Sequence, residues 1–321
     1  MRIAVTGSIA YDYLMEFPGS FQDSLLAEKG HRLTVSFLVE SLRKMQGGVA
    51  GNVAYTLALL GERPLMIGAA GKDFAEYGNR LAHLGVDVTG VTEFKDEYTA
   101  SCFINTDRAN NQLVTFYAGA MARSHELSLE NRELGAADLA VISPTDPEVM
   151  MRYVSEGASL GIPFVFDPGK QTPRMEGPQI LAGIKAAKVV VSNDYEFALM
   201  SQKTGLSEQA LIDLAPLTVL TRGELGSSFF ARGQSEIKVP VAPVSEVKDP
   251  TGAGDAFLAG VVFGLAHELP LDVTGRVGSV AGAYAIEQRG CQEHRFSRGD
   301  FYQRYRAAFG ESAPLKHALK I

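Results

Sequence analysis

Apolar runs alternate with helical patterns along most of this 321-residue chain. The apolar runs that predict short buried strands lie at residues 2–7, 64–71, 139–142, 164–166, 189–191 and 218–220. Helices are predicted at residues 50–60, 74–84, 146–160, 177–186, 194–203 and 253–289, the last with a break at Leu269–Pro270. Strands that alternate with helices indicate a mostly parallel sheet covered by helices on both faces. The predicted fold class is therefore α/β.

Two regions, residues 11–45 and 97–121, break this alternation. They contain the segments YDYLMEF, LTVSFLV, YTASCFINT and NQLVTFYAG, which are rich in strand-forming residues. Asn110–Asn111 suit the turn of a hairpin between the last two segments. We expect these regions to form a small, discontinuous β-sheet. It would be attached to a large α/β domain made of residues 1–10, 46–96 and 122–321.

The composition restricts the classes of function. An apolar fraction of 46% excludes global disorder. The net charge of −7, from 37 acidic and 30 basic residues, argues against a general nucleic-acid binder. Two cysteines are too few for a disulfide scaffold, and the apolar stretch at residues 256–266 is too short to span a bilayer. With no signal-peptide pattern, we expect a cytoplasmic protein without nucleic-acid or membrane partners.

The strongest chemical signal is the segment DPTGAGDAF at residues 249–257. Its two glycines let backbone N–H groups approach a ligand, and a helix that begins near Ala253 directs its positive end at the same place. Asp255, in the first turn of this helix, can accept a proton. An anion-binding helix start beside a carboxylate suits phosphoryl transfer to a hydroxyl. Taken alone, the segment fits a glycine turn before a helix better than it fits a catalytic site.

A second signal is GGVAGNVA at residues 47–54. Paired glycines before a helix permit the close approach of a flat ligand, and Asn52 offers both a donor and an acceptor. Alone, this segment also fits an ordinary helix start. The chain has no Gly-Lys-Ser/Thr of a Walker A loop, and GAGDAF lacks the third glycine of a dinucleotide fingerprint.

Together, GGVAGNVAYTLALLG and DPTGAGDAF, roughly 200 residues apart, resemble the two signatures of the ribokinase-like (PfkB) kinase family. Three shorter elements resemble further family motifs: NDYE at residues 193–196, TRG at 221–223 with Gly226, and Gly7-Ser8 with Asp12. Within the family the chain is most similar to bacterial adenosine kinases, through VTGSIAYDYLMEFPGSF, VSFLVESL, FYAGAM and SNDYE.

The resemblance implies ATP- and Mg²⁺-dependent phosphorylation of the ribose 5′-hydroxyl of adenosine, which gives AMP and ADP. It also implies a ribokinase-like fold with a small β-sheet lid. Alternatives with the same chemistry are an inosine or guanosine kinase and a ribose or fructose kinase. A non-catalytic nucleoside-binding protein is disfavoured by Asp255, because a binder needs no proton acceptor there. Exposed lid edges favour a homodimer formed through the lid.

The resemblance also implies a role for each matching residue. Asp255 is the expected base, and the backbone of Gly252, Ala253 and Gly254 is the expected anion hole. The expected substrate contacts are Ser8, Asp12, Gly47, Gly48, Asn52, Phe116, Met121 and Gln171. The expected ATP contacts are Asn193, Thr221, Gly223, Gly226 and Gly254. The expected ion sites are water-mediated Mg²⁺ at Asn193 and Glu196, and K⁺ at Asp249 and Thr251.

The lid strand that contains Cys102 and Phe103 leaves one alternative open. Related adenosine kinases carry an aromatic residue near this point. Side chains alternate faces along a strand, so only one of the two residues faces the ligand.

Overall fold

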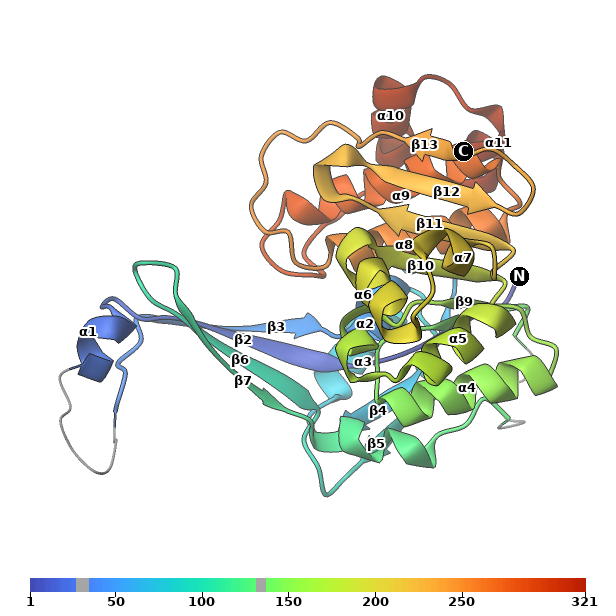
Figure 1. Cartoon of the computed structure of the whole chain (residues 1–321). Coiled ribbons are helices and arrows are strands. Elements are labelled where there is room, and N and C mark those ends of the chain that lie inside the picture. The colour runs from blue at the N-terminus through green and yellow to red at the C-terminus, as the bar shows by residue number, and fades with distance from the viewer. Residues whose placement is uncertain (27–34, 131–136) are drawn as a thin grey trace.

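The structure is a computed structural model that describes residues 1–26, 35–130 and 137–321. Its larger sheet contains β1 (Ile3–Thr6), β4 (Leu65–Gly71), β5 (Val91–Phe94), β8 (Leu139–Ile142), β9 (Phe164–Phe166), β10 (Val189–Asn193), β11 (Leu217–Thr221), β12 (Ser227–Ala231) and β13 (Ile237–Val239). Their order is β13-β12-β11-β10-β9-β8-β1-β4-β5 (Figure 1). The strands pair in parallel from β11 to β5, whereas β12 and β13 are antiparallel. The mostly parallel α/β fold is confirmed, while the antiparallel edge was not predicted.

Helices cover both faces of this sheet, as predicted. The helices are α2 (Val49–Leu59), α3 (Ala75–His83), α4 (Pro147–Ser159), α5 (Gly177–Ala186), α6 (Asp194–Thr204), α7 (Glu208–Ile212), α8 (Ala253–Ala266), α9 (Leu271–Ile286), α10 (Arg298–Phe309) and α11 (Ala313–Ala318). Ile3 and Val5 of β1 pack into a core with α2, α8 and α9, whereas Ala4 packs into a second core with α4, α5 and α6. The central strand is therefore buried on both faces, as its continuous apolar run indicates.

Helix α8 is held in place by close packing against α9. Gly260 of α8 and Gly278 of α9 approach so closely that a Cβ on Gly260 would lie 2.6 Å from the Gly278 Cα. The break predicted at Leu269–Pro270 separates these two helices. Such backbone contact at a helix crossing leaves α8 little freedom to move. No described helix is long and apolar enough to cross a membrane.

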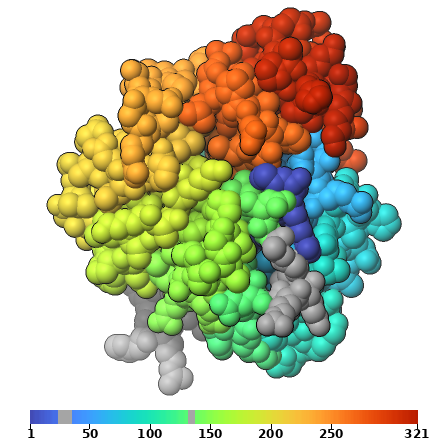
Figure 2. Space-filling view, turned by 90° about the vertical axis from the view of Figure 1, so that its right-hand side faces the viewer, coloured from blue at the N-terminus to red at the C-terminus, as the bar shows by residue number. Residues whose placement is uncertain are grey.

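A second sheet projects from the large body (Figure 1). It contains β2 (Ala10–Glu16), β3 (Ser41–Gly47), β6 (Ala100–Thr106) and β7 (Gln112–Tyr117), in the order β3-β2-β6-β7. The β6–β7 hairpin was predicted, and Asn110 in its turn has a positive φ of 61°. Figure 2 shows the side of the body that faces away from this sheet, where the dark-blue N-terminal residues reach the surface.

The strand predicted at residues 33–39 is wrong for residues 35–39, which have no regular structure, and residues 33 and 34 lie outside the described residues. The ring of Phe37 instead packs at 5.0 Å against Phe17 and Phe21, beside the short helix α1 (Phe21–Leu26). Phe37 thus fills a local aromatic cluster, whereas the neighbouring Leu38 is exposed. The pairing strand is β3, which ends at Gly47, two residues beyond the expected end of the lid at residue 45.

Candidate active site

Two helix N-termini meet at the carboxyl ends of the parallel strands, where ligands bind in open α/β sheets. Helix α2 begins after Gly48 and helix α8 after Gly252, with φ angles of 85° and 79° that favour glycine. A Cβ on Gly48 would lie 2.5 Å from the carbonyl oxygen of Ser8. The two helices pack together, and Asn52 Nδ2 donates a hydrogen bond of 2.7 Å to Asp255 Oδ2. The two strongest sequence signals therefore form one site.

The carboxylate of Asp255 is suited to accepting a proton. Its pKa is raised to about 6, above all by burial. The charges of Asp12 and Glu196 act in the same direction, whereas the Asn52 hydrogen bond and the positive charge of Lys170 oppose them. Asp255 is thus ionised at neutral pH and more basic than an exposed aspartate.

The first turn of α8 offers N–H groups beside this carboxylate. The first hydrogen bond within the helix runs from Ala256 N–H to the Gly252 carbonyl oxygen, at 2.9 Å. The Ala253 N–H, which was expected in the anion hole, already donates to the Pro250 carbonyl oxygen at 3.2 Å. The N–H groups of Gly254 and Asp255 lie in the first turn, where the helix itself supplies no acceptor. The helix start can therefore hold an anion.

Asp12 brings a second carboxylate from the small sheet. A Cβ on Gly47 would lie 2.6 Å from Asp12 Oδ2, so this carboxylate lies directly over the glycine. Burial raises the pKa of Asp12, the positive charge of Lys170 lowers it, and the Asp249 carboxylate adds to the rise. The nearby Ser8 Oγ accepts a hydrogen bond of 3.1 Å from Val49 N–H, so it supports the start of α2.

The strand register settles which of Cys102 and Phe103 faces the site. Cys102 lies opposite Asp12 on β2 and opposite Phe116 on β7, so these three residues share one face of the small sheet. Burial and the Asp12 charge raise the pKa of the Cys102 thiol. Phe103 points the other way and stacks on Tyr13, with ring centroids 4.8 Å apart. Cys102 and Phe116 are therefore on the face that carries Asp12.

The residues expected at the nucleotide lie together at the same sheet edge. Asn193 at the end of β10 is in register with Thr221 at the end of β11. Asn193 Oδ1 accepts a hydrogen bond of 2.7 Å from Glu196 N–H and so caps α6. Burial raises the pKa of Glu196. Gly223 and Gly226, with φ angles of 53° and 88°, form the turn between β11 and β12.

Three other residues that were expected to contact ligands instead contact other parts of the chain. Gln171 Oε1 accepts a hydrogen bond of 3.1 Å from Arg174 rather than from a residue of this site. Met121 lies in the 3₁₀ helix η1 (Gly119–Glu126), which packs against β4 and β6. The Asp249 carboxylate accepts hydrogen bonds from Thr251 N–H at 2.9 Å and Gly290 N–H at 3.0 Å, which shapes its loop. The described residues hold no group of three or more His, Cys, Asp or Glu side chains arranged for a metal ion.

Sequence reasoning missed two charged residues of the site. Asp167 directly follows β9, and burial together with the charges of Glu196 and Asp255 raises its pKa well above the usual range. Lys170 is exposed in the 3₁₀ helix η3 (Gly169–Arg174), and its positive charge lowers the pKa values of Asp12, Asp255 and Glu196. An acidic residue directly after a buried parallel strand was the available signal for Asp167.

Comparison with known proteins adds to this geometry. Residues 10–296 match the pattern of the pfkB family carbohydrate kinases. A nucleoside kinase of Methanothermobacter thermautotrophicus is 27% identical over 319 residues, with 98% of each chain covered. The structure of Burkholderia thailandensis nucleoside kinase in complex with inosine is 35% identical with a TM-score of 0.85, covering 96% of this chain and 98% of that chain. A Thermotoga maritima ribokinase shares the fold, at 20% identity and a TM-score of 0.79 over 95% of this chain and 99% of that chain.

Proposed function

We propose that this chain, which belongs to the pfkB family of carbohydrate kinases, is a nucleoside kinase that phosphorylates the ribose 5′-hydroxyl of adenosine with ATP. The observation that carries the proposal is the ionisable Asp255 carboxylate, held by Asn52 at the N-terminus of α8. A proton acceptor beside an anion-binding helix start is what transfer of a phosphoryl group to a hydroxyl requires. The Methanothermobacter and Burkholderia nucleoside kinases support a nucleoside as the acceptor.

In the proposed reaction, the 5′-hydroxyl oxygen attacks the γ-phosphorus while its proton passes to the Asp255 carboxylate. The new O–P bond forms as the bond between the γ-phosphorus and the bridging oxygen breaks, so ADP leaves with that electron pair. The N–H groups of Gly254 and Asp255 donate to the oxygens of the transferred group. The positive charge of Lys170, which acts on three carboxylates of the site, also favours this anionic group.

The substrate side of the proposal rests on the small sheet together with helix α2. Asp12, above Gly47, accepts a hydrogen bond from a ribose hydroxyl. Asn52 Nδ2 has a second N–H that can donate to the ribose while the first holds Asp255. Phe116 shares the sheet face of Asp12 and provides a ring for the base. The small sheet of β2, β3, β6 and β7 then acts as a lid over the acceptor.

The proposed cosubstrate is ATP, bound at the edge formed by Asn193, Thr221 and the Gly223–Gly226 turn. The same Burkholderia enzyme has been solved in complex with ADP-inosine, which supports a nucleotide site in a related chain. Oxygen donors around Glu196, whose pKa is raised by burial, fit a Mg²⁺ ion that keeps most of its waters. When bound, Mg²⁺ supplies positive charge to the phosphates. The K⁺ loop at Asp249 and Thr251 stays a prediction.

A panel of acceptors tests the proposed function. With saturating Mg·ATP, we expect kcat/KM for adenosine to exceed that for ribose or fructose about 10-fold or more, because a sugar lacks the base that stacks in the lid. ADP release measured with adenosine, inosine, guanosine, ribose and fructose gives the comparison. The inosine complex of the Burkholderia enzyme makes inosine the second candidate. An inosine preference would correct the base alone, whereas a sugar preference would overturn the nucleoside proposal.

We further propose a homodimer through the small sheet. Leu42, Phe103 and Leu113 lie on the sheet face opposite Asp12 and are 64%, 37% and 41% exposed. A second copy would remove this apolar surface from water. Sedimentation should give a dimer for the wild type and a monomer for Leu113→Lys. The matched control is Leu160→Lys at the end of α4 on the large body, where Leu160 is 48% exposed; a wild-type monomer would refute the dimer.

A further inference from the structure

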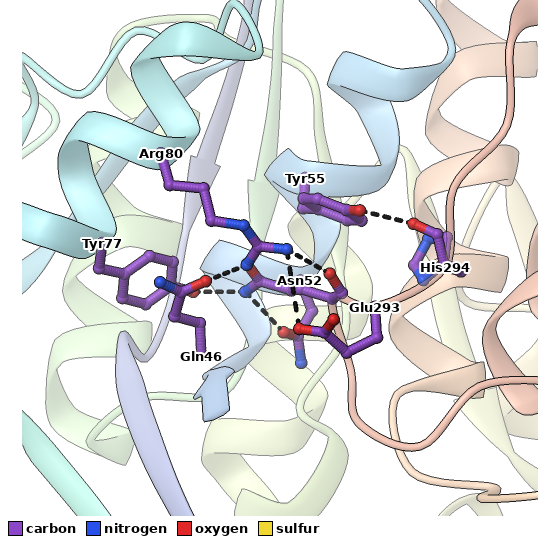
Figure 3. Close-up of polar contacts among 8 residues, drawn as sticks. Gln46, Asn52, Tyr55, Tyr77, Arg80, Glu293 and His294 are labelled. Atoms are coloured by element: carbon purple, nitrogen blue, oxygen red, sulfur yellow. Dashed lines mark hydrogen bonds and ion pairs between the residues drawn. The ribbon is translucent and has the colours of Figure 1, made fainter. Parts of the chain in front are cut away.

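A buried glutamine connects the active site to the opposite end of the chain. Gln292 lies on the loop between α9 and α10, and only 1% of its surface is exposed. Its Nε2 donates a hydrogen bond of 3.0 Å to Asn52 Oδ1 and a second hydrogen bond to Tyr77 Oη. Its backbone carbonyl oxygen accepts a hydrogen bond from Arg80 Nη2. Figure 3 draws this cluster, with Asn52, Tyr77 and Arg80 converging on the loop.

The hydrogen bond to Asn52 fixes the orientation of an amide. An asparagine side chain can present either its oxygen or its NH₂ group in a given direction. Because Gln292 donates to Oδ1, the NH₂ group of Asn52 is left to face the Asp255 carboxylate. In the flipped orientation two acceptor oxygens would face each other, which disfavours the ionised form of Asp255.

The same glutamine is itself held on two sides. Tyr77 Oη accepts from Gln292 and donates a hydrogen bond of 2.8 Å to the Gly47 carbonyl oxygen, beside Asp12. Arg80 donates to the Gln46 side chain as well as to the Gln292 backbone, and lies 3.8 Å from Glu293. The loop after α9 is therefore tied to α3 and to the end of β3. A rotation of the Gln292 side chain would break contacts on both sides.

We propose that Gln292 is a positioning residue, which holds the Asn52 amide so that its N–H group faces the Asp255 carboxylate and keeps that carboxylate ready to take the substrate's proton. The proposal rests on the proposed role of Asp255 as the base. The other titratable groups that face Asp255 are Asp12, Asp167, Lys170, Glu196 and Cys291. The substitutions below alter none of them.

The test is the pH dependence of kcat for Gln292→Met, which keeps the side-chain length and removes the donor. We expect the acid limb of the kcat profile to move up by about one pH unit, because the ionised base loses its oriented donor. The KM for the nucleoside should change by only a few-fold, because an Asn52 amide in either orientation can still form a hydrogen bond with a ribose hydroxyl. The control is Gln288→Met in the same loop, with a wild-type profile expected. A purely structural role would lower kcat equally at every pH.

A double-variant cycle separates this coupling from a folding defect. In an Asn52→Ala background, Gln292→Met should cause no further shift of the acid limb, because the amide that it positions is gone. If Gln292→Met does not fold, Gln292→Leu provides the same test, since its uncharged side chain also lacks the donor. If a folded Gln292 variant keeps the acid limb of its kcat profile at the wild-type pH, the inference is overturned, and the proposed role of Asp255 as the base is unaffected. A wild-type profile without an acid limb, together with an active Asp255→Asn, overturns the proposed role of Asp255 as the base, on which this inference rests.

Discussion

Asp255→Asn is expected to reduce kcat by about 10²–10⁴-fold at neutral pH, the range typical of a lost general base. The amide keeps the size of the carboxylate and cannot accept the proton of the 5′-hydroxyl. Its effect on the affinities for nucleoside and ATP should stay within a few-fold, because the binding groups at Asp12 and at the β10–β11 edge are untouched. Steady-state kinetics with both substrates varied measures the two effects separately.

The pH dependence of kcat tests the same role of Asp255, because it predicts in which direction activity changes with pH. The pKa of Asp255 is raised to about 6, and the base acts in its ionised form. Wild-type kcat should therefore fall as the pH drops below about 6, and the limb should be missing from the residual activity of Asp255→Asn. If the variant keeps more than about half of the wild-type kcat, Asp255 is not the base.

The start of α8 could be predicted from the sequence because its signal is local. Two glycines, a first-turn carboxylate and the start of an apolar run occur within nine residues, and the helix begins at Ala253 as expected. The resemblance to the PfkB family could be recognised for the same reason, since each of its motifs is short and contiguous. The match of residues 10–296 to that family confirms it. The strand expected at residues 35–39 was wrong because apolar content alone does not tell a strand from a loop that fills a cluster.

The contacts that complete the site could not be predicted in this way. Gln292 is 240 residues from Asn52 in the chain, and no motif surrounds it. Its importance appears only when α2, α3 and the loop after α9 are packed together. Asp167 and Lys170 both follow the end of β9. Their charges act on Glu196, which follows the end of β10, because β9 and β10 are neighbours in the sheet. Long-range packing therefore decides the electrostatics of a site whose main residues the sequence suggests.

The second large effect is expected at the opposite end of the acceptor. Asp12→Ala removes a half-buried carboxylate that lies over Gly47 and accepts from a ribose hydroxyl in the proposed complex. A hydrogen bond to a charged group is worth about 1.5–3 kcal/mol, so the KM for adenosine should rise about 10- to 150-fold. The KM for ATP should change within a few-fold. The matched control is Glu16→Ala, at the exposed far end of the same strand.

Deoxynucleosides make this prediction specific to the hydroxyl. Wild-type enzyme should discriminate against the 2′- or 3′-deoxy analogue of adenosine that lacks the partner of Asp12, because the carboxylate is then left partly buried and unpaired. In Asp12→Ala that discrimination should disappear, since neither acceptor can form the bond. Loss of affinity for ATP and adenosine to the same extent would point to a folding defect instead. Unchanged discrimination in a folded variant would remove Asp12 from the ribose site and leave the proposed chemistry at Asp255 intact.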